Sequence, residues 1–143
     1  MCIRHCRFGI WNTSLGVGGA SAIADLLAVN TSLKTLALSR SEIGDHGMEK
    51  LVAGLIANEE GGLHELQLTD AGITGAGSSK FASLLVNSNC SVETTRQLSF
   101  TALDSARPAL FDALATNPSL KKLQLKEWKL NNEHAAALVV VLK

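Results

Sequence analysis

The chain has 143 residues, of which 46% are hydrophobic and 18% are charged, with 13 basic residues against 13 acidic ones. This balance argues against a charge-driven preference for nucleic acid or membranes, and the apolar content predicts one folded domain instead of a disordered chain. Aromatic residues make up only 4% and Tyr is missing, which disfavours base-stacking surfaces and aromatic ligand pockets.

Cysteine usage and the first residues bear on the compartment. Three cysteines are too few, and odd in number, for a disulfide-stapled secreted domain. The opening MCIRHCRFGIW has no long apolar run, so it looks like neither a signal peptide nor a membrane span. We therefore expect an intracellular, cytoplasmic protein, although a fragment beginning at an artificial Met would look the same.

One segment of the chain returns later in similar form. NTSLKTLAL at residues 30–38 reappears as NPSLKKLQL at 117–125, which is 87 residues away, or three times 29. Intermediate copies exist, because large apolar residues follow the polar corners at intervals of 30, 30, 29 and 28 residues: Ile3, Leu33, Leu63, Val92 and Leu120. A second large apolar residue follows each of the last four by 18 residues: Leu51, Phe81, Leu110 and Leu138. The first unit needs 20 residues to reach Ile23, which predicts two extra residues in its turn.

Within each unit, the apolar period changes. Residues 33–38, 63–68 and 120–125 follow the pattern LxxLxL, whose final alternation predicts a strand with one buried face. Residues 3–8 form a degenerate copy, with Cys6 and Phe8 facing inward. After a turn, apolar residues recur at helical spacing, and glycines are expected where the chain needs freedom to start this element: Gly19, Gly47 and Gly77. Asparagines follow the helices, where we expect the left-handed conformation: Asn30, Asn58, Asn87 and Asn117.

This order of strand, turn and helix at 28–30 residues resembles the ribonuclease-inhibitor type of leucine-rich repeat, most specifically in NTSLKTLALSRSEIGDHGMEKLVAGL. The resemblance covers nearly the whole chain. It implies an α/β solenoid, a right-handed horseshoe segment with a parallel sheet on its concave side. Residues 1–143 would be a single domain of about five units, at about 3–32, 33–62, 63–91, 92–119 and 120–143. Stacking is needed because one unit cannot bury its own apolar face.

The sequence departs from this family at its turns and in its fourth unit. The family usually has Asn or Cys three residues after the last strand leucine, and here the slot holds other residues: Trp11, Ser41, Ala71, Phe100 and Trp128. Looser or wetter turns are expected, because unpaired backbone groups are costly. In the fourth unit Thr95 and Gln97 occupy the inward positions, while Leu98 and Phe100 are one residue out of register. A slip and a bulge both remain open there.

Both ends lack a polar capping unit. The last residues, HAAALVVVL at 134–142, are apolar, and the first strand would present an unpaired edge. Solenoids need their ends covered for solubility. Either the chain is part of a longer array, or another subunit covers its ends, with contacts expected at Val139, Val140 and the first strand.

Catalytic and metal-binding signals are weak. Cys2, His5 and Cys6 could suggest zinc, but a structural site needs four ligands and the remaining cysteine is the distant Cys90. A buried Cys6 beside an exposed His5 is the favoured interpretation. The glycine-rich segment 16–19 lacks the Lys-Ser or Lys-Thr of a phosphate loop. We expect no enzyme activity, no metal and no cofactor.

The partner is expected on the concave wall, on the residues that alternate with the inward leucines: Arg7, Thr35, Ser39, Glu65, Gln67, Thr69, Arg96, Lys122, Gln124 and Lys126. The charged members are basic except for Glu65, so an acidic protein segment is one candidate partner, and ordinary solvated positions are the alternative. The sequence thus predicts a non-catalytic protein–protein interaction module or a structural subunit of a larger complex, with no nucleic acid or membrane partner.

Two alternatives follow from the same resemblance. Repeats of this type also occur in GTPase-activating proteins for Ran, whose activity would need a positioned arginine; Arg7, Arg40 and Arg96 are present, but no motif singles one out. They also form the sensor region of intracellular immune receptors. That class predicts an ATP-binding domain, which this sequence lacks.

Overall fold

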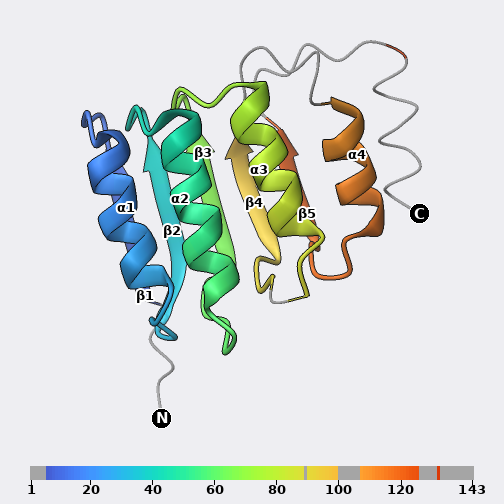
Figure 1. Cartoon of the computed structure of the whole chain (residues 1–143), viewed down its shortest axis with the longest axis horizontal. Coiled ribbons are helices and arrows are strands. Elements are labelled where there is room, and N and C mark those ends of the chain that lie inside the picture. Colours follow the sequence, from blue (N-terminus) through green and yellow to red (C-terminus); the bar gives the residue numbers. More distant parts are fainter. Residues whose placement is uncertain (1–5, 89, 100–106, 126–131, 133–143) are drawn as a thin grey trace.

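The computed structural model describes residues 6–88, 90–99, 107–125 and 132. Strands and helices alternate along this part of the chain: β1 (Cys6–Trp11), α1 (Gly16–Leu27), β2 (Leu33–Ser39), α2 (Gly44–Ala57), β3 (Glu65–Thr69), α3 (Gly75–Leu85), β4 (Thr94–Leu98), α4 (Arg107–Thr116) and β5 (Lys122–Leu125). The strands form one parallel sheet in chain order, and the four helices all lie on the same side of it (Figure 1). Each helix packs against the next. Among the described residues, no helix combines the length and apolar character that crossing a bilayer requires.

The buried strand residues of successive units stack in rows across the sheet. Leu36 pairs with Leu66, and Leu38 pairs with Leu68. All four side chains are 0% exposed, and burial of each stabilises the fold by about 1.5–3 kcal/mol. The stacking predicted from the repeat is therefore confirmed, and this row forms the core between sheet and helices.

The predicted frame of β1 is wrong by two residues. Phe8 pairs with Leu36 and Ile10 with Leu38, where the predicted frame had Cys6 and Phe8. Cys6 is exposed instead of buried. Ile10 is half-buried in this frame, whereas Phe8, on the edge strand, remains 43% exposed. Trp11 pairs with Ser39, and α1 and α2 begin at Gly16 and Gly44, so the turn after β1 is as long as the turn after β2 and holds no extra residues.

Strand β4 is irregular, and each of the two registers that the sequence allowed is found in one part of it. Thr95 pairs with both Leu66 and Leu123, as the unshifted register requires. Leu98 pairs with Leu125, and the register shifts between Thr95 and Leu98. A bulge of this kind adds one residue to one strand, so β4 starts in one register and ends in the other.

The Thr95 hydroxyl in β4 is a buried polar group whose effect on stability can be measured. It is fully buried and has no hydrogen-bond partner among the described residues. Thr95→Val keeps the shape and removes an unpaired polar group, so the free energy of unfolding should rise by about 1 kcal/mol in urea denaturation. Thr94→Val, on the half-buried neighbouring position of β4, should change it by less than about 0.5 kcal/mol. A destabilised Thr95→Val variant would contradict the prediction.

The turns after the strands are bonded from unit to unit through the backbone. Ser41 and Ala71 stand in the predicted Asn or Cys slots, and both are 0% exposed. The Ser41 carbonyl accepts from the Leu15 N–H at 3.0 Å, and the Ala71 carbonyl accepts from the Gly44 N–H at 3.0 Å. These backbone hydrogen bonds thus join neighbouring turns, although neither slot holds the Asn or Cys that the resemblance predicts.

The corner asparagines act through their side chains. The Asn58 amide donates to the carbonyls of Leu27 at 2.8 Å and Asn30 at 3.0 Å, in the preceding unit. The Asn117 amide likewise donates to the Leu85 carbonyl at 2.5 Å. None of the four corner asparagines has a positive φ, so the expected left-handed conformation is wrong. Asn58 and Asn117 therefore bond neighbouring units together, whereas the Asn30 side-chain oxygen accepts from the Ser32 and Leu33 N–H groups of its own corner.

Asp45 joins α2 to the start of α3. Its carboxylate accepts from the Thr74 N–H at 2.7 Å, the Thr74 hydroxyl at 2.5 Å and the Gly77 N–H at 2.9 Å. A Cβ on Gly77 would lie 2.5 Å from the Asp45 Oδ1. Gly77 has no positive φ, and the same holds for the other two glycines predicted to need freedom. At Gly77, the absence of a side chain lets the Asp45 carboxylate of the preceding unit approach the backbone closely.

Candidate functional site

The face of the sheet away from the helices carries the residues predicted to bind a partner. We call it the open face, because no described element covers it (Figure 1). Backbone pairing arranges its residues in three rows across the strands: Arg7, Thr35, Glu65, Thr94 and Lys122; Gly9, Ala37, Gln67 and Arg96; Trp11, Ser39 and Thr69. The predicted alternation is therefore confirmed as a placement, and partner binding by these residues stays a prediction.

The accessibility of the predicted residues varies along the rows. Arg7, Lys122 and Gln124 are exposed, whereas Thr35, Ser39, Glu65 and Gln67 are half-buried. Thr69 is only 6% exposed, so it offers a partner little surface. Some predicted residues lie outside the described part of the chain: Cys2, His5, Phe100, Lys126, Trp128, Val139 and Val140.

Trp11 is the open-face residue that the sequence analysis assigned to the wrong place. The predicted frame put it in a turn, but it ends β1 opposite Ser39, and it is 56% exposed. Its ring lies over Gly9, since a Cβ on Gly9 would be 2.2 Å from the indole carbon Cη2. The alternation of Phe8 and Ile10, counted from the correct frame, would have placed Gly9 and Trp11 on the open face.

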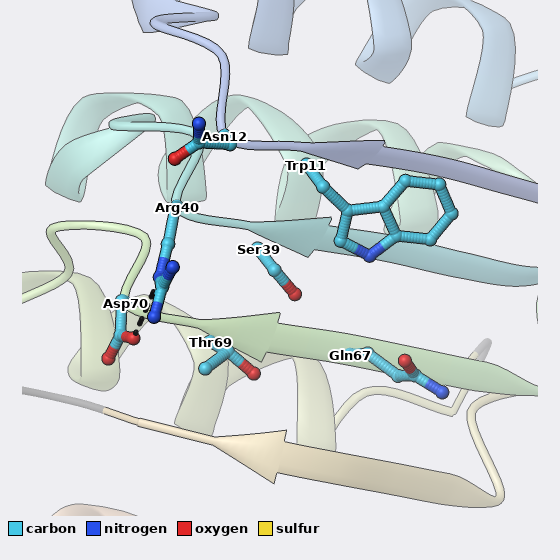
Figure 2. A pocket seen from close by; sticks show the side chains of 7 residues that line it. All are labelled: Trp11, Asn12, Ser39, Arg40, Gln67, Thr69 and Asp70. Carbon is cyan, nitrogen blue, oxygen red and sulfur yellow. Dashed lines mark ion pairs between the residues drawn. The ribbon is translucent and has the colours of Figure 1, made fainter.

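Trp11 borders a pocket of about 320 Å³ at the carboxyl ends of the first three strands. The other lining residues are Asn12, Ser39, Arg40, Gln67, Thr69 and Asp70, shown in Figure 2. Asn12, Arg40 and Asp70 occupy corresponding turn positions in three units, and their φ angles are 55°, 52° and 49°. This repeated left-handed turn sets the rim of the pocket.

The two carboxylates on this part of the open face already have partners. Arg40 Nε lies 3.7 Å from Asp70 Oδ2, and the two side chains are 70% and 36% exposed. The Gln67 amide donates to Glu65 Oε1 at 2.6 Å but is neutral, so Glu65 keeps its negative charge. No described acidic side chain forms an ion pair with Arg7 or Lys122. In the first row these two cations therefore outnumber the one anion, Glu65.

The side chains that line the pocket are suited to binding. Within the described ranges, no group of three or more His, Cys, Asp or Glu side chains is placed to hold a metal ion. The lining groups are an indole, hydroxyls, amides and one ion pair, all of which contact a ligand by stacking or hydrogen bonding.

Comparison with known proteins identifies the architecture. A family model described as a leucine-rich repeat matches residues 29–52. The structure is also similar to leiomodin-1 actin-binding site 2 (ABS2), with a TM-score of 0.79 and 20% sequence identity, over 97% of this chain and 79% of that one. The fold is a leucine-rich repeat solenoid. The matched segment begins in the turn after α1, includes β2 and ends within α2. No curated protein matches the sequence.

Proposed function

We propose that this leucine-rich repeat chain is a non-catalytic protein-interaction module that binds a partner polypeptide across the open face. The observation that carries the proposal is the Trp11 indole, 56% exposed on a face that the described helices leave free. Tryptophan is among the residues most enriched in interface hot spots. An exposed indole held in place by its contact with Gly9 offers contact area at little entropic cost.

The dimensions of the open face suit an extended segment. Arg7 and Lys122 stand at the two ends of the first row, four strand spacings apart. At about 4.8 Å per spacing the row is about 19 Å long, and an extended peptide of about six residues covers that distance. Such a segment would cross all five strands and contact every described unit.

The same proposal covers the repeat type, the domain organisation, the location of the chain and one candidate partner. The repeats are of the ribonuclease-inhibitor type, as supported by the 28–30-residue spacing and by a helix after each of the first four strands. The chain is one domain whose ends are covered by further chain or another subunit, inside the cell. The similar leiomodin-1 structure is named as an actin-binding site, and actin is accordingly one candidate partner to assay.

Variants on the two sides of the sheet test the proposal. Immobilised wild-type chain, Trp11→Ala, Thr35→Glu and Lys50→Ala are compared for capture of partners from the native source and of purified actin. Lys50 is exposed on α2, so Lys50→Ala is the control. We expect Trp11→Ala to weaken capture by at least about tenfold, because hot-spot truncation costs about 2 kcal/mol or more. Thr35→Glu should weaken capture as well, because it places a larger, charged side chain in the first row of the open face. Equal capture by all four chains would refute binding at the open face.

A further inference from the structure

We infer that the pocket beside Trp11 receives a carboxylate side chain, Asp or Glu, from the extended segment of the partner. This inference rests on the proposed function and adds the chemistry of the anchoring residue. It concerns Trp11, Asn12 and Arg40, none of which the sequence analysis placed at a binding surface.

The pocket is rich in hydrogen-bond donors. The Arg40 guanidinium directs Nε toward Asp70 at 3.7 Å, which leaves its two terminal nitrogens for a ligand. In Figure 2 the indole nitrogen of Trp11 is on the ring edge that faces β2 and β3. The Ser39 hydroxyl and the Asn12 amide line the same space. An ionised carboxylate can accept hydrogen bonds from donors of each of these kinds.

The charges favour an anion over a cation. The pocket lining holds one cation, Arg40, and one anion, Asp70, which pair with each other. Glu65 keeps its charge beside the neutral Gln67 amide but is not among the lining residues. An anion meets Arg40 in the pocket, and Arg7 and Lys122 in the first row attract it to this face, which raises its local concentration and association rate.

The size of the pocket is sufficient for one Asp or Glu side chain. Its volume of about 320 Å³ is at the small end for ligand sites in proteins. The Trp11 ring provides an apolar wall against which the methylene groups of Asp or Glu can pack. The pocket is also continuous with the open face, so the partner backbone can remain on the strands while one side chain enters.

Peptide titration followed by NMR tests the inference. The probes are N-acetylated, amidated hexaglutamate, hexaglutamine and hexalysine, and the signal is the indole N–H cross-peak of Trp11, assigned from its loss in Trp11→Phe. Hexaglutamate should shift this peak saturably, and more weakly as salt is added. Arg40→Gln should bind hexaglutamate about tenfold more weakly, because hydrogen bonds to charged groups are the stronger ones. Lys50→Gln, on the helical side, should bind like wild type.

Three results would overturn the inference: hexalysine binding more tightly than hexaglutamate, no peptide moving the Trp11 peak, or Arg40→Gln binding hexaglutamate like wild type. Partner capture separates this from the proposed function. Loss of capture by Thr35→Glu with full capture by Arg40→Gln would refute the carboxylate pocket and leave open-face binding intact. Capture that none of the open-face variants alters would refute open-face binding itself.

Discussion

Leu66→Ala is expected to lower the free energy of unfolding by about 2–5 kcal/mol, the range for buried Leu→Ala changes. Leu66 is 0% exposed in the central strand β3, where it pairs with Leu36 on one side and Thr95 on the other. Both neighbours are fixed by their own strands, so the core cannot easily collapse into the space left by the side chain. Neighbouring units share this core, and the cavity therefore weakens contacts on both sides.

The same substitution at an exposed position is the control for Leu66→Ala. Leu26 on α1 is 45% exposed, and Ala is a slightly better helix former than Leu. Leu26→Ala should change stability by less than about 1 kcal/mol in urea denaturation. If Leu66→Ala costs no more than Leu26→Ala, the stacked leucine row is not what holds the solenoid together.

Asp45→Asn is expected to destabilise the fold by about 1–3 kcal/mol, since hydrogen bonds to a charged group contribute about this much. Asp45 accepts three hydrogen bonds, from the Thr74 N–H, the Thr74 hydroxyl and the Gly77 N–H. Asn has one acceptor oxygen in place of two and carries no charge to favour the N-terminus of α3. Asp25→Asn, at an exposed position of α1, is the matched control, with an expected change within about 0.5 kcal/mol.

The effect of Asp45→Asn should depend on pH. Burial raises the pKa of Asp45, but the hydrogen bonds from Thr74 and Gly77, with the charge of His46, outweigh burial and hold the pKa below its ordinary value. A pKa lowered by folding gives stabilisation that is present above the unfolded value of about 3.9 and is lost as pH falls through the folded value. Asn cannot ionise, so the stability difference between wild type and Asp45→Asn should narrow below about pH 4. If the stability difference between wild type and Asp45→Asn stays constant from pH 7 to pH 3, the ionised Asp45 carboxylate is not its cause.

The part of the candidate site that lies on strands could be predicted from the alternation of side chains along each strand. Once residues 33–38 and 63–68 are recognised as strands, every second side chain must face away from the leucines, and this placed Thr35, Glu65 and Gln67 correctly. The alternation could not locate the pocket, because its rim comes from turns of three units. Nor could it find Trp11, because the frame chosen for β1 decides whether this residue lies in the turn or ends the strand.

By itself, the sequence determined the period, the order of strand and helix, and the corners at which units meet. These follow from short-range spacing, since apolar residues can be buried only if they recur with the period of the element that carries them. Tertiary structure alone decided the two-residue frame of β1, the bulge in β4 and the bond between Asp45 and Thr74, which are 29 residues apart. Each of these depends on which groups of a neighbouring unit come within reach, and that is settled by pairing and packing across the sheet and not by the spacing within a unit.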